Sequence, residues 1–356
     1  MYRKPNVPLL IRILAFGEIL WDMLPAGKKL GGAPVNFLYH AKTLGANVRS
    51  LTRIGNDLLG RELLEQLKKL DLSTEFLQIT TSAPTGTVDV SLDSTGNPAF
   101  HIVENVAWDA IGITPSILES SIKFLTSPNV VSALYFGSLA LRTEKNIDSL
   151  SKLLLAIPDS VLRVCDLNLR KPFYNRETII FALTHADVVK LNDNEAILLD
   201  TFFADKNPQR LSLLADNSQS LNSSLQTNLT LTTQTLRNWA SYLLDAFSLQ
   251  SVIVTCGANG AFFFNQSGFV YSPSKSIEVK DTVGAGDSFA AVCVYGILKG
   301  IPTRKIVEEA SKRAAFVCSQ SGGTPHIPHK LCIPFDNDSN NDYRNRSVRS
   351  HTRIEH

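Results

Sequence analysis

Eleven consecutive residues near the C-terminus, Asp281–Ala291, have the types and order needed for proton transfer beside a bound anion. Gly284, Ala285 and Gly286 come directly before an apolar stretch that predicts a helix. Small residues leave their backbone N–H groups uncovered, so these groups and the helix dipole together favour an anion. Asp287 follows in the first turn, where it can accept a proton from a hydroxyl group that attacks the anion. The segment predicts phosphoryl transfer with Asp287 as the base.

Three other interpretations of this segment are weaker. The spacing of Gly284 and Gly286 occurs in dinucleotide-binding loops, but the third glycine is absent and the segment lies far from the first strand. A Walker A loop needs GxxxxGK followed by Ser or Thr, and the sequence contains no such segment. A plain helix start, with Asp287 complementing the dipole, is the remaining alternative.

A second polar cluster follows the apolar run Ile11–Phe16. Asp22 comes after this predicted strand, at the strand end where open α/β sheets bind ligands. Gly31 and Gly32 let a ligand approach the backbone, and Asn36 lies one turn inside the predicted helix that follows. A carboxylate and an amide suit a ligand that carries vicinal hydroxyl groups. The alternative is a Gly-Gly loop before an ordinary helix.

Apolar runs of four to eight residues recur along the chain and alternate with helical patterns such as Asp57–Leu70. Continuous hydrophobicity of this kind is typical of strands buried on both faces of a parallel sheet. The pattern predicts the α/β class, as a doubly wound three-layer sandwich. The predicted strands are Ile11–Phe16, Ala133–Phe136, Val161–Cys165, Val188–Leu191 and Val252–Thr255.

One stretch alternates between polar and apolar residues instead. Residues Gly86–Leu92 and Ala99–Val103, with turn residues 93–97 between them, predict an antiparallel hairpin. A hairpin is marginal alone, so it must pack on something. We interpret it as part of a small β lid formed by about 20–34 and 84–108, and the alternative is an edge of the main sheet.

The remaining boundaries follow from composition. Residues 1–332 are predicted to form a single domain. A polar insertion is expected at about 204–236, and Asn217–Leu236 contains no charged residue. The next helix is expected to begin near Thr235, and residues 333–356 are expected to be a disordered tail.

Charge and composition limit the kind of partner. The chain has 356 residues, a formal net charge of +2, 44% hydrophobic residues and five scattered cysteines. Nucleic-acid binding needs a clustered basic excess, so we expect a small-molecule partner and no nucleic acid. No apolar run approaches the roughly 20 residues that span a bilayer, so we expect no membrane contact. The cysteines are typical of free thiols in a reducing compartment, which favours a cytoplasmic protein.

These segments resemble the ribokinase-like, or PfkB-type, carbohydrate kinases. DTVGAGDSF at 281–289 matches the family signature DTxGAGDxF, and GGAPVN at 31–36 is similar to its GGxxxN sugar-binding element. The substrate aspartate of the family corresponds to Asp22. Matching elements run from about residue 13 to residue 328. The resemblance implies a ribokinase-like fold that binds ATP, Mg²⁺ and a sugar.

The resemblance also implies roles for polar residues after two central strands. Asp166–Arg170 is similar to the family's DxNxR stretch, in which Arg170 would clamp the substrate or a phosphate. Lys190–Glu195 resembles its NxxE element, which implies that Asn192 and Glu195 help to place Mg²⁺, partly through water. A surface ion pair of Arg170 and a helix cap at Asn192 are the alternatives.

The nucleotide side is implied in the same way. Residues 255–260 resemble the family's TxGxxG loop, which places Thr255, Gly257 and Gly260 with Asn192, Gly284 and Gly286 in ATP binding. A strand-turn-strand hairpin is the alternative interpretation. Some family members bind a monovalent cation, so K⁺ is left open here. The corresponding residues are Asp281, Val283, Ser319 and Gly322.

Three segments favour one branch of the family. GEILWD at 17–22, LGGAPVNF at 30–37 and ENVAWD at 104–109 resemble fructokinases, which implies conversion of fructose to fructose 6-phosphate. Kinases of 2-keto-3-deoxygluconate, ribose or a nucleoside remain alternatives, and so does a catalytically idle sugar-binding regulator. A homodimer formed through the lid and a monomer with a covered lid fit the sequence equally.

Overall fold

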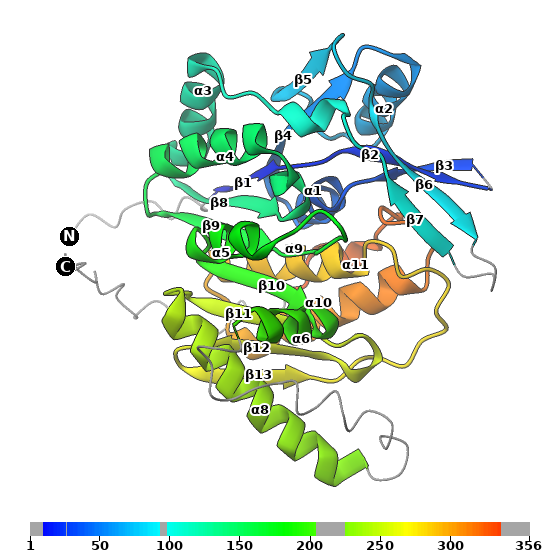
Figure 1. Cartoon of the computed structure of the whole chain (residues 1–356). Helices are drawn as coiled ribbons and strands as arrows, with labels where there is room; N and C mark the ends of the chain where they lie inside the picture. The colour runs from blue at the N-terminus through cyan, green and yellow to red at the C-terminus, as the bar shows by residue number, and fades with distance from the viewer. Residues whose placement is uncertain (1–9, 26, 93–97, 204–224, 336–356) are drawn as a thin grey trace.

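A nine-stranded sheet forms the centre of the molecule, in the order β13-β12-β11-β10-β9-β8-β1-β4-β5 (Figure 1). The computed structural model describes residues 10–25, 27–92, 98–203 and 225–335. The strands from β11 to β5 are parallel, and β12 and β13 are antiparallel additions at one edge. The strands are β1 Leu10–Phe16, β4 Asn47–Gly55, β5 Leu77–Thr80, β8 Val130–Gly137, β9 Val161–Asp166, β10 Val188–Asn192, β11 Ser251–Thr255, β12 Ala261–Asn265 and β13 Gly268–Ser272.

Helices cover both faces of this sheet, and each face has its own apolar core (Figure 1). One layer consists of α3 Pro115–Thr126, α4 Glu144–Ala156, α5 Arg176–Thr184, α6 Asp193–Phe202 and α8 Leu225–Ala246. The other consists of α1 Ala33–Thr43, α2 Leu58–Lys69, α9 Ala285–Leu298 and α10 Thr303–Cys318. Shorter helices are η1 Ala107–Ala110, η2 Leu139–Arg142, η4 Gly257–Asn259 and α11 His329–Cys332. The predicted three-layer α/β sandwich is confirmed.

The predicted local elements form for the expected reasons. All five predicted strands are present as β1, β8, β9, β10 and β11, and burial between two helix layers explains why their sequences do not alternate. Helix α2 begins after Asp57, whose side chain accepts the Gly60 N–H at 2.7 Å. Its apolar stripe buries Leu63 and Leu67 against the core.

The predicted hairpin is confirmed, as β6 (Gly86–Leu92) and β7 (Pro98–Ile102). It belongs to a separate four-stranded sheet of order β3-β2-β6-β7, with β2 at Leu20–Leu24 and β3 at Gly27–Gly31. This small sheet lies beside the main one (Figure 1), so the alternative of a main-sheet edge is wrong. It packs over an apolar cluster that includes Trp108.

Two predicted boundaries are wrong. Helix α8 begins at Leu225, ten residues before the expected start near Thr235, so the second part of the predicted insertion is helical. Ser, Thr and Asn lower helix propensity only moderately, and Trp239 and its neighbours anchor the helix in the core. Phe335 is buried and stacks on Tyr295, so the chain stays packed beyond the predicted start of the tail. Residues 204–224 and 336–356 lie outside the described residues.

All five cysteines are free thiols, as predicted. Across the described parts of the chain, the helices are too short or too polar for any of them to cross a membrane.

Candidate active site

The carboxyl ends of three neighbouring parallel strands carry polar side chains. Asp166 ends β9 and is paired in register with Lys190 of β10, and Asn192 of β10 is paired with Thr255 of β11. The start of helix α9 lies close to these strand ends. A Cβ atom placed on Gly286, in the first turn of α9, would lie 2.9 Å from Lys190 Nζ. The structure thus brings the C-terminal motif onto these strand ends.

The start of α9 is shaped by Gly284. This residue has a φ of 77°, and a Cβ atom on it would lie 2.5 Å from the Cα atom of Gly323. The Ala285 N–H donates to the Thr282 carbonyl at 3.3 Å, so it is partly engaged within the turn. The next N–H groups of a first helical turn have no acceptor within the helix. These N–H groups can still bind an anion. Of the three amides predicted to do so, those of Gly284, Ala285 and Gly286, the Ala285 N–H is already partly engaged.

Asp287 occupies the first turn of α9 and is partly buried. Its Oδ2 accepts a hydrogen bond of 2.9 Å from Asn36 Nδ2 of α1. Burial and the nearby Asp166 carboxylate raise the pKa of Asp287 to about 7, against the opposing effects of Lys190 and Arg170. A carboxyl group with such a pKa is suited to accept a proton at neutral pH.

A buried ion pair lies beneath Asp287. Lys190 Nζ is 3.1 Å from each carboxylate oxygen of Asp166, and the Tyr135 hydroxyl donates to Asp166 Oδ2 at 3.1 Å. Burial opposes the charged form of Lys190, but the surrounding carboxylates, Asp166 above all, raise its pKa. The sequence prediction missed this pair, although charged residues inside otherwise apolar strands were a usable signal.

Glu18 is another residue that the prediction missed. It is 2% exposed and follows β1, and its Oε1 accepts the Ala33 N–H at 3.2 Å. Because Gly32, the N-cap of α1, has no side chain, Glu18 caps this helix from outside. Its Oε2 has no hydrogen-bond partner among the described residues. Burial raises the pKa of Glu18 to about 7, and the charge of Asp287 adds to this rise.

Asp22 lies within β2 of the small sheet, opposite Lys29 of β3. Burial raises the pKa of Asp22 to about 6, and Asp281 adds to the rise. A Cβ atom on Gly31 would lie 2.5 Å from Asp22 Oδ2, and one on Gly32 would lie 2.7 Å from a backbone oxygen. The contacts that require glycine at these two positions are therefore made with the protein itself.

Asn192 and Glu195 form a capping box at the start of α6. Asn192 Oδ1 accepts the Glu195 N–H at 2.9 Å, and Glu195 Oε2 accepts the Asn192 N–H at 2.8 Å. The other oxygen of Glu195 accepts the Leu169 N–H at 2.7 Å. These contacts favour the helix-cap alternative and do not fit direct ligation of Mg²⁺. No cluster of three or more His, Cys, Asp or Glu residues suited to a metal occurs in the described part of the chain.

A phosphoryl-transfer site needs a base beside an anion site, and Asp287 and the amides of α9 provide both at the polar strand ends. A comparison with family models decides which family of proteins this chain belongs to. Residues 25–330 match the model of the pfkB family carbohydrate kinases. This chain is a pfkB family carbohydrate kinase. The resemblance predicted from the motifs is confirmed.

Relatives of this pfkB kinase have several substrates in their names. It is 24% identical over 341 residues to a probable fructokinase-2 of Arabidopsis thaliana, covering 89% of this chain and 92% of the relative. It is 25% identical over 313 residues to the ribokinase of Mus musculus, covering 86% and 83%. The fructokinase of Xylella fastidiosa, solved with bound ATP, has a TM-score of 0.69 at 20% identity, covering 88% and 94%.

The residues of the pfkB kinase that were predicted to bind the nucleotide, Thr255, Gly257 and Gly260, lie at and just after the carboxyl end of β11. Thr255 Oγ1 donates to the Leu191 carbonyl at 3.4 Å. Gly257 faces open space, whereas a Cβ atom on Gly260 would lie 2.2 Å from the Ser272 carbonyl oxygen. Gly257 therefore leaves room for a ligand, and Gly260 is required by the turn.

The residues considered for a monovalent cation gather around Asp281. Its Oδ1 accepts the Val283 N–H at 3.0 Å, and its Oδ2 accepts the Gly322 N–H at 2.8 Å. Lys29 Nζ of the small sheet lies 3.4 Å from the same oxygen and donates to Ser321 Oγ at 2.9 Å. The fourth residue, Ser319, follows α10, and its hydroxyl donates to the Phe316 carbonyl of that helix.

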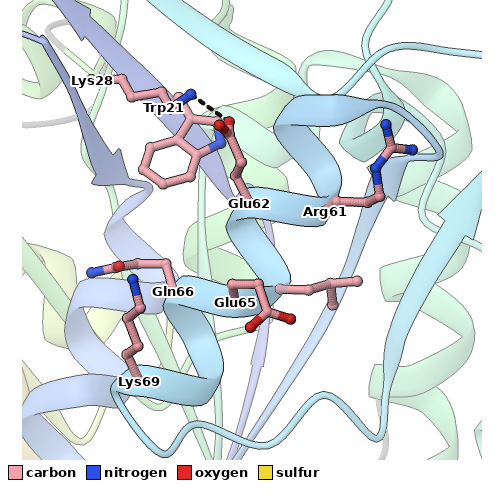
Figure 2. A pocket seen from close by; sticks show the side chains of 8 residues that line it. Trp21, Lys28, Arg61, Glu62, Glu65, Gln66 and Lys69 are labelled. Carbon is pink, nitrogen blue, oxygen red and sulfur yellow. Dashed lines mark hydrogen bonds and ion pairs between the residues drawn. The ribbon is translucent and has the colours of Figure 1, made fainter.

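A groove of the pfkB kinase runs beside α2. Figure 2 shows it along the outer side of α2, with the ion pair of Lys28 and Glu62 beside Trp21. Lys28 Nζ lies 5.4 Å from the centre of the Trp21 ring system. The groove is lined by Trp21, Lys28, Arg61, Glu62, Leu64, Glu65, Gln66 and Lys69. None of these was predicted as a site residue.

Proposed function

We propose that this pfkB kinase transfers the γ-phosphoryl group of ATP to fructose and forms fructose 6-phosphate. The observation that carries the proposal is the placement of Asp287 in the first turn of α9, where Asn36 holds it at 2.9 Å. The N–H groups of this turn have no acceptor within the helix. A base next to an anion site is the arrangement needed for attack of a hydroxyl group on a phosphoryl group.

In the proposed reaction, the substrate hydroxyl loses its proton to an oxygen of Asp287 as its own oxygen forms a bond to the γ-phosphorus atom. The bond from this phosphorus to the bridging oxygen breaks, and ADP leaves. Amides at the start of α9 offset the charge that develops on the phosphoryl oxygens. If ATP is bound as its magnesium complex, the metal would reduce the negative charge of the phosphates. Arg170, which is exposed at the end of the stretch after β9, is proposed to contact the substrate.

The small sheet is proposed to act as a lid on the sugar side. It carries Asp22, and its Lys29 contacts Asp281 and Ser321 of the segments next to α9. A sugar bound beneath Asp22 would therefore be enclosed by two sheets, which would exclude water as a competing nucleophile.

The choice of sugar is supported by the fructokinase-like segments and by the Arabidopsis relative at 24% identity. With ATP and Mg²⁺ supplied, we expect ADP release to be fastest with fructose among fructose, tagatose, ribose, 2-keto-3-deoxygluconate and adenosine. A coupled assay measures these rates, and parallel runs with K⁺ or Na⁺ salts test cation dependence. If fructose is among the poorest substrates, the branch assignment is wrong. Sugar binding without ADP release would instead indicate a regulator.

Activity is expected to depend on pH through Asp287. Its pKa is raised to about 7, so the basic carboxylate form is lost as the pH falls below that value. We expect kcat/KM for the sugar to fall about tenfold per pH unit below pH 7 and to be level above pH 8. The sugar does not titrate, so it is varied at saturating MgATP. A level profile down to pH 5 would contradict a base with this pKa.

A further inference from the structure

Carboxyl groups crowd the reaction centre on the side of the main sheet. Asp166, Glu18 and Glu195 are all buried within the electrostatic reach of Asp287 or of its neighbour Lys190. An attack on ATP would bring further negative charge to the same place. Lys190 is a buried cation in this region, and it lies on β10, an interior strand of the main sheet.

The position of Lys190 is fixed from two sides. Asp166 holds its Nζ with two contacts of 3.1 Å, and β9 and β10 are paired at these two residues. On the other side, Nζ is 2.9 Å from the place where a side chain on Gly286 would begin. Only glycine lets the first turn of α9 approach the ammonium group so closely. Lys190 is thus directed at the segment that holds Asp287.

We propose that Lys190 is a positioning residue for phosphoryl transfer, whose ammonium group keeps Asp287 ionised and offsets charge at the start of α9. Asp166 orients Lys190 and limits its effect. The inference rests on the proposed role of Asp287 as the base. It also explains how the site handles phosphate in a chain whose net charge is only +2, since a buried cation acts more strongly than one on the surface.

An ordinary structural ion pair between β9 and β10 is the competing explanation. If the pair only holds the strands together, removal of either partner disturbs the site in the same way. If the pair acts through its charges, the two removals have opposite effects on Asp287. Loss of Lys190 removes a positive charge from the surroundings of Asp287, and loss of Asp166 removes a negative one.

Several other ionisable groups also act on Asp287 or on this pair, and they stay unchanged in the test. They come from four different segments of the chain. These groups are Glu18 after β1, Tyr135 of β8, Arg170 after β9 and Glu195 of α6.

The test compares Lys190→Met and Asp166→Asn in the full chain, with kcat/KM for the sugar measured against pH at saturating MgATP. We expect the acidic limb to move up by about one pH unit or more in Lys190→Met and down by a similar amount in Asp166→Asn, the shift typical of a neighbouring charge. Lys152→Met, which breaks the exposed pair with Asp148 on α4, is the matched control and should not move the limb. Shifts in the same direction, or no shift in either variant, would overturn the proposal.

A second variant covers the risk that a lone buried charge prevents folding. In Lys190→Met/Asp166→Asn both charges are removed together, and thermal unfolding shows whether the protein is native. We expect at least a tenfold loss of kcat at the pH plateau, and wild-type kcat would overturn the role of Lys190. Asp287→Asn is measured in parallel. If Asp287→Asn retains turnover, the proposed function fails. If Asp287→Asn is inactive but the pH profiles of Lys190→Met and Asp166→Asn do not shift, only the role of Lys190 is rejected.

Discussion

Replacement of Asp287 with alanine is expected to lower kcat by about 10²–10⁴, the usual contribution of a general base. The variant removes the group that accepts the hydroxyl proton but leaves the backbone of α9 and the small sheet in place. Sugar affinity should change much less than kcat, because Asp22, Gly31 and Gly32 are untouched and Asn36 loses only its hydrogen bond to Asp287. Turnover from ADP release and sugar binding from calorimetry separate the two effects.

The same variant decides between catalysis and helix stabilisation. An acidic residue in a first helical turn contributes about 0.3–1 kcal/mol through the helix dipole. Glu144 occupies the first turn of α4 and is exposed, so Glu144→Ala is the matched control. It should cost a similar free energy of unfolding and leave kcat unchanged. If Asp287→Ala also keeps wild-type kcat, the residue only complements the dipole.

Much of the fold follows from patterns that are local in the sequence. Buried parallel strands need continuous apolar runs, and each such run became a strand of the central sheet. The glycines and aspartate of 284–287 were recognisable because they combine special backbone geometry with a reactive group. The start of α8 was less predictable. The first half of this helix is polar in sequence and gives no clear helical pattern, and only the second half is anchored in the core.

The ion pair of Asp166 and Lys190 shows what local patterns cannot give. The two residues are 24 positions apart, and their contact depends on the register between β9 and β10. The same holds for Glu18, which caps α1 across a stretch that includes two strands of the small sheet. Such contacts follow from the topology, so sequence reasoning finds the residue types but not their partners.

The segment Asn192–Glu195 illustrates a different limit. An Asn followed three residues later by a Glu is a family element for Mg²⁺ and phosphate, and it is also a capping pattern. Both interpretations fit the same two residues at the same spacing. The structure favours the cap, because Asn192 Oδ1 accepts the Glu195 N–H and Glu195 Oε2 accepts the Asn192 N–H.

The second large effect is expected at Gly284, where alanine should impair both folding and turnover. A φ of 77° costs a residue with a side chain roughly 1–2 kcal/mol. The new Cβ atom would also stand 2.5 Å from the Cα atom of Gly323, whose carbonyl accepts a hydrogen bond of 2.9 Å from buried His40. Neither backbone can yield freely, so the start of α9 should shift. A displacement of about 1 Å can cost about 10²-fold in rate, and we expect kcat to fall by about that factor.

The opposite end of the same helix supplies the control for Gly284→Ala. Gly300 has a φ of 68°, but the space around a Cβ atom there is open. Gly300→Ala should therefore carry the backbone cost of roughly 1 kcal/mol without moving α9. Denaturant unfolding and kcat are measured for both variants. A loss of kcat at Gly284 alone assigns the effect to the close contact with Gly323. If both variants have equal unfolding free energies and wild-type kcat, the start of α9 tolerates the new Cβ atom. Phosphoryl transfer would then not depend on the exact position of the amides in the first turn of α9.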